Sequence, residues 1–208
     1  RHVAVHRRDR VSKHMLAGHN IGLSIPRATE IRRGWEHVFC TKQIIQHHTV
    51  SLKEVNYLFP LWLGPQWPDT KRRANYSSAA IRALEASSHL EYQDEGDADW
   101  DGRGDLESNF GPRDVFDAVY SLLHSIKYRE RYRDFLKGSF ARIPINMSRE
   151  LFAALVRLGS ELTSLHLLDL PALGRQITEY LGAHAEVEKV SYSDETVWID
   201  KAKTRGFK

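Results

Sequence analysis

The sequence predicts an α+β fold, with a small mixed sheet, a helical middle segment and a C-terminal β-hairpin. Three observations support this prediction. The first third of the 208 residues contains short apolar runs bounded by Gly or Pro, which is typical of strands. From Pro112 the apolar residues recur with the period of helices. Near the C-terminus, two runs rich in Val, Tyr and Trp flank Ser193-Asp194-Glu195, which is the pattern of a hairpin.

Strands are expected at residues 21–25, 37–40 and 57–63, where short apolar or alternating runs occur. Residues 64–76 hold Gly64, Pro65, Pro68 and a basic triplet, a composition typical of turns and loops, and a short helix is expected over 79–86. Segment 91–107 is rich in Asp and Glu and poor in apolar residues. Such a segment buries too little surface to offset the entropy of ordering, so we expect a solvated acidic loop.

The helical part begins at Pro112, which suits the first helical position and is followed by the favourable early carboxylate of Asp114. A second helix, with Tyr128 and Tyr132 on its apolar stripe, is expected to end at Gly138. Ser148 then predicts the N-cap of a third helix that runs to about residue 168. A short fourth helix is expected from 171 to about 182.

One irregular domain is expected, in four parts: 1–76 strands and loops, 77–108 helix and acidic loop, 109–183 helices, and 184–208 hairpin. Because the chain starts at Arg1 and stops directly after strand-like sequence, we expect a fragment that is truncated at both ends. Cys40 is the only cysteine, which excludes an internal disulfide and a cysteine-based zinc site and suggests a cytoplasmic location. No apolar run reaches the roughly 18–20 residues that span a bilayer, so no membrane partner is expected.

The net charge of +3, with a pI of about 9.0, is too small to indicate nucleic-acid binding by itself. Its distribution is more informative. Segment 1–33 carries eight Arg and Lys against Asp9 and Glu30, and residues 71–73 form a second basic cluster. One interpretation of the first segment is phosphate contact, helped by Asn20, Gln43 and Asn56 at base edges. The other is an ordinary solvated or domain-docking face, and this second interpretation is favoured for the helix with Arg129, Arg131 and Arg133.

No common catalytic or nucleotide-binding signature is present: the sequence lacks a Walker loop, a dinucleotide-binding glycine motif, a zinc-protease motif, a hydrolase elbow and an amino-methyltransferase motif. The run Asp97-x-Asp99-x-Asp101-Gly102 is similar to a calcium loop, but Ser108 stands where that loop needs a bidentate Glu. His37, His47 and His48 are candidate metal ligands, although adjacent histidines on a strand point to opposite faces. His124, His166 and Cys40 are expected to be core positions. No metal site is predicted.

A set of motifs nevertheless occurs in a recognisable order. The helical part contains FGPRDVFDAVYSLLHS at 110–125, YRERY at 128–132, FARIP at 140–144 and LHLL at 165–168. Upstream lie Asn20-Ile21-Gly22-Leu23 with Arg27, the 37–39 run, and YLFPLWL at 57–63. This pattern resembles the C-terminal specificity region of the single-polypeptide Type I (Type ISP) restriction-modification enzymes. Ala118 and Ala141 depart from it, where the family tends to have an aromatic residue and a proline, and both departures look structural.

The resemblance implies DNA target recognition in a large bacterial phage-defence enzyme whose nuclease, ATP-driven translocase and adenine methyltransferase lie in other domains of the same polypeptide. S-adenosylmethionine, ATP and Mg would then belong to those domains, and this fragment would hold no cofactor and no catalytic residue. Its partner would be double-stranded DNA. From charge placement we predict these DNA-binding residues: Arg27, Arg32, Arg33, Lys42, Lys53, Asn56, Arg72 and Arg73. We expect them to gather on one concave face. The alternative is a structural scaffold that packs on the methyltransferase domain.

Overall fold

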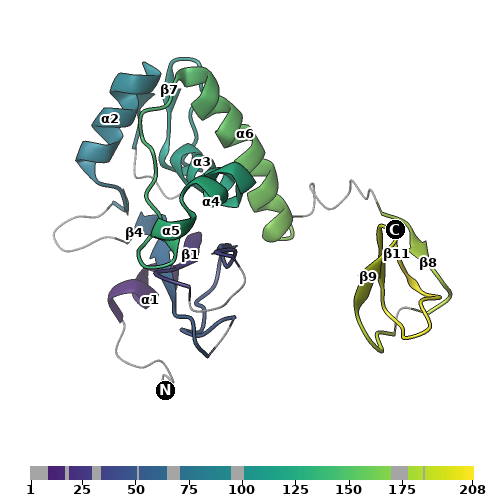
Figure 1. Cartoon of the computed structure of the whole chain (residues 1–208). Coiled ribbons are helices and arrows are strands. Elements are labelled where there is room, and N and C mark those ends of the chain that lie inside the picture. The colour runs from purple at the N-terminus through teal and green to yellow at the C-terminus, as the bar shows by residue number, and fades with distance from the viewer. Residues whose placement is uncertain are drawn as a thin grey trace. The chain divides into compact units, whose positions relative to one another are not determined.

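The computed structural model describes residues 9–16, 19–29, 34–50, 52–64, 71–94, 101–169, 178–184 and 186–208. The chain divides into two compact units, Arg1–Leu167 and Leu168–Lys208, where the sequence had suggested one irregular domain. Both are drawn in Figure 1. The first unit contains α1 (Asp9–Leu16), β1 (Gly22–Pro26), β2 (Phe39–Thr41), β3 (Asn56–Pro60), β4 (Trp62–Leu63), β5 (Arg73–Ala74), α2 (Ser78–Ser88), β6 (Glu91–Tyr92), β7 (Asn109–Phe110), α3 (Pro112–His124), α4 (Ile126–Arg131), α5 (Arg133–Leu136) and α6 (Arg149–His166).

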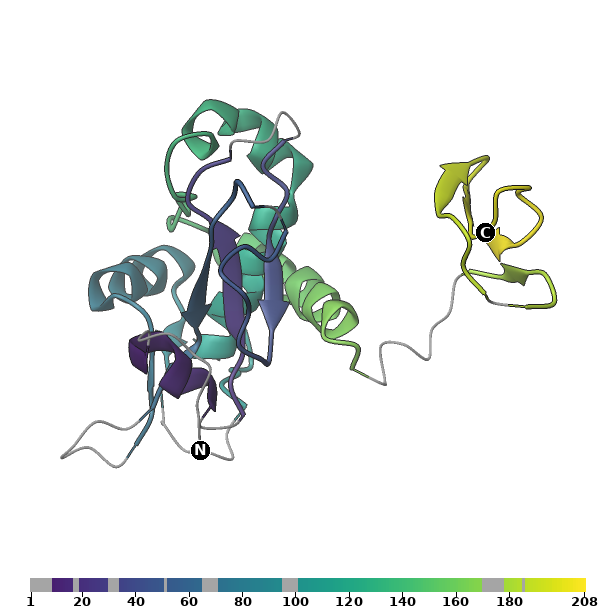
Figure 2. The same cartoon turned by 90° about the horizontal axis from the view of Figure 1, so that it is seen from below.

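The main sheet of the first unit is antiparallel, in the order β2-β1-β3. Leu23 lies opposite both Cys40 and Phe59, so these three side chains share one face. That face is directed at the helices: Leu23 packs on the main core and the Phe59 ring lies 5.7 Å from that of Phe140. Figure 2 shows the sheet alongside the helices. All three expected strands of this region are present, although 57–63 is divided into β3 and β4 at the bend of Leu61.

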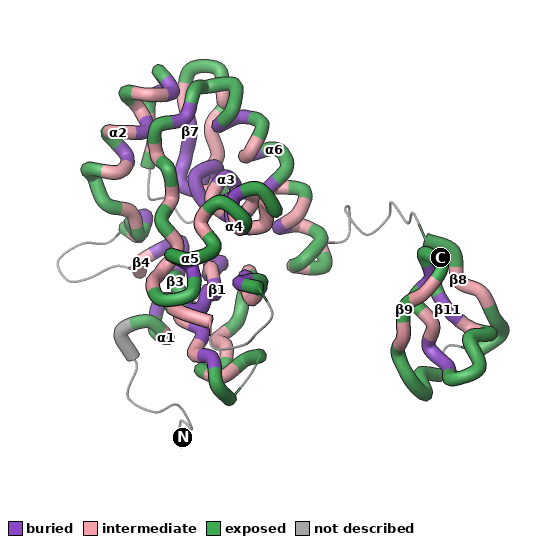
Figure 3. The backbone as a smooth tube through the Cα atoms, viewed as in Figure 1, coloured by how far each residue is buried: buried purple, intermediate pink, exposed green. Residues whose placement is uncertain are grey.

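α3 forms the centre of the unit and is buried along most of its length (Figure 3). Phe116 and Tyr120 belong to the core that faces the sheet, whereas Val115 and Ala118 belong to the core beneath α2. A helix that is apolar on two sides is covered on two sides. α6 packs directly against α3, and the Ser148 hydroxyl caps α6 by accepting a hydrogen bond from Leu151 N, as expected.

α3 and α6 approach closely at Gly159. A Cβ atom on this residue would lie only 1.8 Å from the Asp117 carbonyl oxygen, so the contact admits glycine alone. The Asp117 side chain is fully buried and accepts hydrogen bonds from Thr163 Oγ1 at 2.9 Å and from Arg103 Nη2 at 2.7 Å. The two helices are therefore joined by a backbone contact and by a buried polar network.

The acidic segment is more ordered than the sequence indicated. Residues 95–100 lie outside the described residues, but β6 pairs in parallel with β7 on either side of them. Between 101 and 109 the chain is held by carboxylates: Asp105 accepts backbone hydrogen bonds from Glu107, Ser108 and Asn109. Gly102 is buried, and its carbonyl oxygen accepts a hydrogen bond from Arg113 N at 2.7 Å. The prediction of a fully solvated loop is wrong for this half, because backbone amides and Arg103 compensate its charge.

Three further expectations differ from the structure. The N-terminal third contains a helix, α1, that was not predicted. The single second helix that was expected to end at Gly138 is two short helices, α4 and α5, which meet at Tyr132. The helix expected from 171 lies outside the described residues up to 177, and Tyr180–Leu181 is a strand rather than its last turn.

The second unit is a four-stranded antiparallel sheet in the order β8-β11-β10-β9, made of β8 (Tyr180–Leu181), β9 (Ser191–Ser193), β10 (Thr196–Trp198) and β11 (Gly206–Phe207). The predicted hairpin is β9–β10. Its turn residues Asp194 and Glu195 both have positive φ, of 55° and 57°, which matches the twist that two-residue hairpins favour. A second turn is fixed by Asp200, whose carboxylate accepts hydrogen bonds from Thr204 N and Oγ1.

Replacing Gly159 by Ala should destabilise the first unit by about 3 kcal/mol, because the helices must separate to admit the methyl group. Urea unfolding followed by circular dichroism measures this change. Gly138→Ala is the matched control, since nothing lies within 4 Å of its added Cβ, and it should be neutral or slightly stabilising. Equal stabilities for the two variants would contradict the close helix contact.

Candidate nucleic-acid interface

The main sheet separates the predicted DNA-binding residues into two groups. Arg27 follows the Pro26 end of β1, and Lys53 shortly precedes Asn56, which pairs with Pro26. Lys42 follows Thr41, which pairs with Gly22 at the opposite end. The two ends of β1 are about 13 Å apart at the usual rise per residue. The described members of the predicted set therefore lie at two separate ends of the sheet.

The β4–β5 hairpin continues the sheet at the Gly22 end, because Leu61 N donates to Ile21 O immediately before β4. Trp62 pairs with Ala74 and Leu63 with Arg73. This pairing brings Arg72 and Arg73 to the Gly22 end. Arg73 is exposed, whereas the guanidinium of the half-buried Arg72 lies 4.0 Å from the centroid of the Trp62 ring.

α1 is fixed against the same hairpin by one buried amide. Asn20 Nδ2 donates to the carbonyl oxygens of His14 (2.9 Å) and Trp62 (2.8 Å), and its Oδ1 accepts from the amides of Ile21 and Trp62. His14 adds a second link, because its Nδ1 accepts from Gly64 N at 2.9 Å. In Figure 1 α1 and β4 lie close together at one side of the sheet. Asn20, considered above for base contact, is buried and has this structural role.

The electrostatics of His14 show that α1 and β5 place positive charge at the same spot. Burial lowers the pKa of His14, and the charges of Lys13 on α1 and Arg73 on β5 lower it further. The described residues here include Lys13, Lys71 and Arg73 as exposed cations. Lys13 is missing from our predicted set because the helical period of 9–16 was not recognised.

The other end of the sheet is organised around a buried carboxylate. Glu54, 1% exposed, accepts hydrogen bonds from Thr29 and from His37 Nδ1, the latter at 2.5 Å. Asn56 is also buried there, and its amide donates to Ser24 Oγ and to His37 O. Burial places Asn56 away from any partner at the surface. Arg32 and Arg33 lie outside the described residues.

The described part of the chain contains no group of three His, Cys, Asp or Glu side chains that could hold a metal ion. Asp97 and Asp99 of the calcium-like run lie outside that part, and Asp101 is 3.8 Å from Arg103 Nε. His47 and His48 are 3.2 Å apart through their Nδ1 atoms, and His37 is engaged by Glu54. Among the same residues, no helix is long and apolar enough to cross a membrane.

A cluster of titratable side chains lies between the sheet and the helices. Tyr120, fully buried, shares a hydrogen bond of 2.6 Å with His166 Nδ1, and the His124 ring lies 4.6 Å from the Tyr120 ring. Burial, followed by the nearby charge of Arg129, lowers the pKa of His124 to about 4. Burial raises the pKa of the Cys40 thiol. These shifts favour neutral groups, so the cluster is suited to a core and not to proton transfer near neutral pH.

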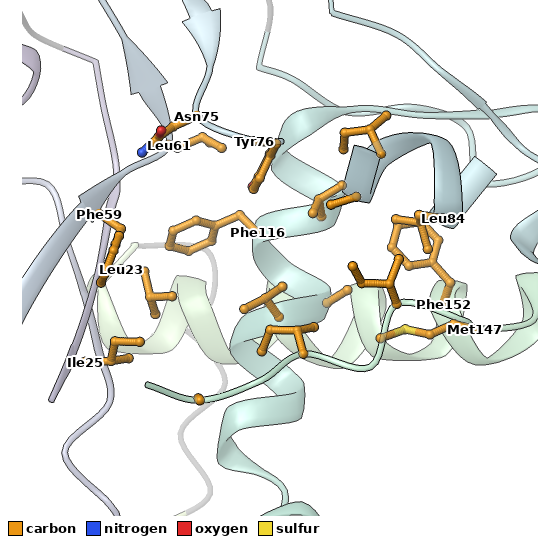
Figure 4. A pocket seen from close by; sticks show the side chains of 18 of the residues that line it. Leu23, Ile25, Phe59, Leu61, Asn75, Tyr76, Leu84, Phe116, Met147 and Phe152 are labelled. Carbon is orange, nitrogen blue, oxygen red and sulfur yellow. The ribbon is translucent and has the colours of Figure 1, made fainter. Parts of the chain in front are cut away.

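An apolar cavity of about 550 Å³ lies between the sheet, α2 and α3 (Figure 4). Its walls include Leu23 and Phe59 from the sheet, Phe116 from α3 and Phe152 from α6. The polar side chains of its lining are Asn75 and Tyr76, and both form hydrogen bonds to backbone carbonyl groups. Asn75 Nδ2 donates to Pro60 O, and the Tyr76 hydroxyl donates to Pro112 O. The lining therefore presents no group positioned for acid–base chemistry.

Comparison with known proteins decides the family. The family model described as the Type ISP C-terminal specificity domain matches residues 1–206. The chain belongs to this family. No curated protein matches it significantly.

Two solved structures share the fold of this specificity domain. They are a DrdV–DNA complex (TM-score 0.52, 15% identity, covering 90% of this chain and 17% of that one) and the ATP-dependent Type ISP restriction-modification enzyme LlaBIII bound to DNA (TM-score 0.53, 16% identity, covering 91% and 11%). The specificity domain thus spans less than a fifth of the length of either chain. At such low identity the likeness concerns the fold alone.

The half-buried His124 should make the specificity domain less stable in mild acid. Its folded pKa, about 4, is below the ordinary 6.5, so between these values the unfolded chain binds a proton that the folded chain does not. Stability should fall as the pH decreases through this window, by about 2 kcal/mol from pH 7 to pH 5 for this one residue. Urea unfolding at both pH values measures the loss.

His124→Gln should remove that part of the pH dependence, because the amide has no proton to gain. The same substitution at His48, which lies in a turn outside this cluster, is the control and should retain the full wild-type difference between pH 7 and pH 5. The account of the cluster is untenable if both variants lose stability with acid as the wild type does.

Proposed function

We propose that this chain recognises the DNA target of a Type ISP restriction-modification enzyme and carries out no reaction itself. The observation on which this proposal depends is membership of the specificity-domain family along nearly the whole chain. Exposed Arg and Lys at the sheet ends and on the β4–β5 hairpin provide further support. So does the shared fold with two proteins that were solved as DNA complexes.

Recognition divides into two kinds of contact. Arg and Lys side chains on phosphates fix the register of the domain on the duplex, and a few polar or Arg side chains reach base edges in the major groove and select the sequence. The reactions belong to other domains of the polypeptide: adenine methylation with S-adenosylmethionine, and cleavage that follows ATP- and Mg-dependent translocation. Because the methyltransferase must rotate an adenine out of the stack, the specificity domain would hold the duplex in place while it does so.

Salt dependence of duplex binding tests this proposal. Each neutralised phosphate releases condensed counterions, so the logarithm of the affinity should fall linearly with the logarithm of salt concentration, by about 0.9 per contact. Four contacts would weaken binding about 100-fold between 50 and 200 mM salt. Fluorescence anisotropy with the 208-residue chain and a mixed-sequence duplex measures the slope, and selection from a random duplex pool should enrich one sequence. A flat salt profile would contradict DNA recognition by this chain.

The scaffold alternative is supported by one feature of α6. Leu151, Leu158 and Leu165 recur every seven residues and are 51%, 61% and 40% exposed. Leucines at this spacing form the contact stripe that two packed helices share. The fitting occupant is a helix of another domain of the same polypeptide, since the proteins of similar fold hold more than four-fifths of their length outside this region. A chain that served only this purpose would show no salt-dependent affinity for DNA.

A further inference from the structure

The exposed, described cations among Lys13, Lys71 and the predicted DNA-binding residues lie at two ends of one sheet, and the two ends differ in shape. At the Gly22 end, a two-stranded hairpin and the helix α1 are joined by the buried amide of Asn20. The major groove of B-form DNA, about 12 Å wide, admits either a two-stranded ribbon or a helix. The described residues at the Pro26 end include the last residues of β1, the first residues of β3 and the turn that carries Lys53.

Charge also distinguishes the two ends. At the Pro26 end, next to Lys53 in the sequence, the buried Glu54 carboxylate is already paired with His37 Nδ1 at 2.5 Å. At the hairpin, Asp94 Oδ2 accepts from Ala74 N, but Asp94 is exposed and therefore screened by solvent. At the hairpin end the charges of Lys13 and Arg73 both act on His14, so these two cations lie close together.

The hairpin end is also better ordered for binding. Lys71 and Arg73 are exposed, and Arg72 between them is held against the Trp62 ring. This contact anchors the segment that carries Lys71 and Arg73. The bond between His14 and Gly64 fixes the last turn of α1, and hence Lys13, at the same place. Cations that are already positioned lose less conformational entropy when they meet a phosphate.

We propose that the edge formed by α1 and the β4–β5 hairpin is the surface that contacts duplex DNA, with Lys13, Lys71 and Arg73 on phosphates. This inference rests on the proposed function and refines it, since it selects one of the two basic ends. Arg27 and Lys53 are then surface cations outside the interface.

Three double variants, each of which lowers the net charge by two, test this assignment in the 208-residue chain. Lys13→Gln/Arg73→Gln removes charge from the hairpin edge, and Arg27→Gln/Lys53→Gln removes it from the opposite end. Arg131→Gln/Arg133→Gln is the matched control on exposed positions of α4 and α5. Circular dichroism and urea unfolding confirm that each variant is folded. The probe is a mixed-sequence duplex, titrated by anisotropy between 50 and 200 mM salt.

The hairpin variant should lower the salt slope by about 2 and weaken binding about 50-fold at 0.1 M salt, through the loss of two phosphate contacts. The other two variants should keep the wild-type slope. A larger loss of slope in Arg27→Gln/Lys53→Gln, or equal losses in all three, overturns the assignment while leaving DNA recognition intact. If the wild-type chain itself shows no salt-dependent binding, the proposed function fails, and this inference fails with it.

Discussion

The contact between α3 and α6 at Gly159 is the constraint on which the first unit depends. The Asp117 carbonyl oxygen occupies the place where any other residue would carry a side chain, so the two helices lie at the closest separation that a backbone allows. This proximity brings Thr163 of α6 within hydrogen-bonding distance of the buried Asp117 carboxylate. An unpaired charge in that position would be costly, and the compensating charge comes from Arg103, which precedes α3, and from Arg113 in the first turn of α3. Steric fit and charge compensation therefore specify the same geometry.

The same network explains why part of an acidic segment is ordered. Arg103 reaches Asp114 and Asp117, and Asp114 accepts hydrogen bonds from the amides of Gly104 and Gly111. Burial raises the pKa of Asp114, while these amides and Arg103 favour its charged form. The segment before α3 is thereby attached to the first turn of that helix. From composition, the carboxylates of this segment were expected to repel one another. In residues 101–109 several of them instead bind Arg103 and backbone amides.

The sequence predicted the structure correctly where interactions between neighbouring residues determine it. Pro112 and Ser148 begin helices where predicted, and the Asp194-Glu195 turn forms the expected hairpin, because each signal involves neighbouring residues. Prediction from the sequence failed where contacts between residues far apart in the chain determine the structure. α1 is anchored by Asn20, whose partner at Trp62 is 42 residues away, and Arg103 lies 57 residues from Ser160. For the candidate site, polar residues such as Asn20 and Asn56 were considered for base contact from their chemistry. The structure uses both to satisfy buried backbone or side-chain groups, a demand that one-dimensional charge counting does not reveal.

Charge along a chain and charge on a surface are therefore different quantities in this protein. A five-residue strand is long enough to move its flanking cations about 13 Å apart, more than the Debye length of about 10 Å at 0.1 M salt. Cations separated in this way act on a phosphate backbone independently, so the total net charge says little about affinity. What determines recognition is which cations share one rigid element. In this fold that condition is met where a short helix and a two-stranded hairpin are fastened together by buried hydrogen bonds, a feature that only the folded chain displays.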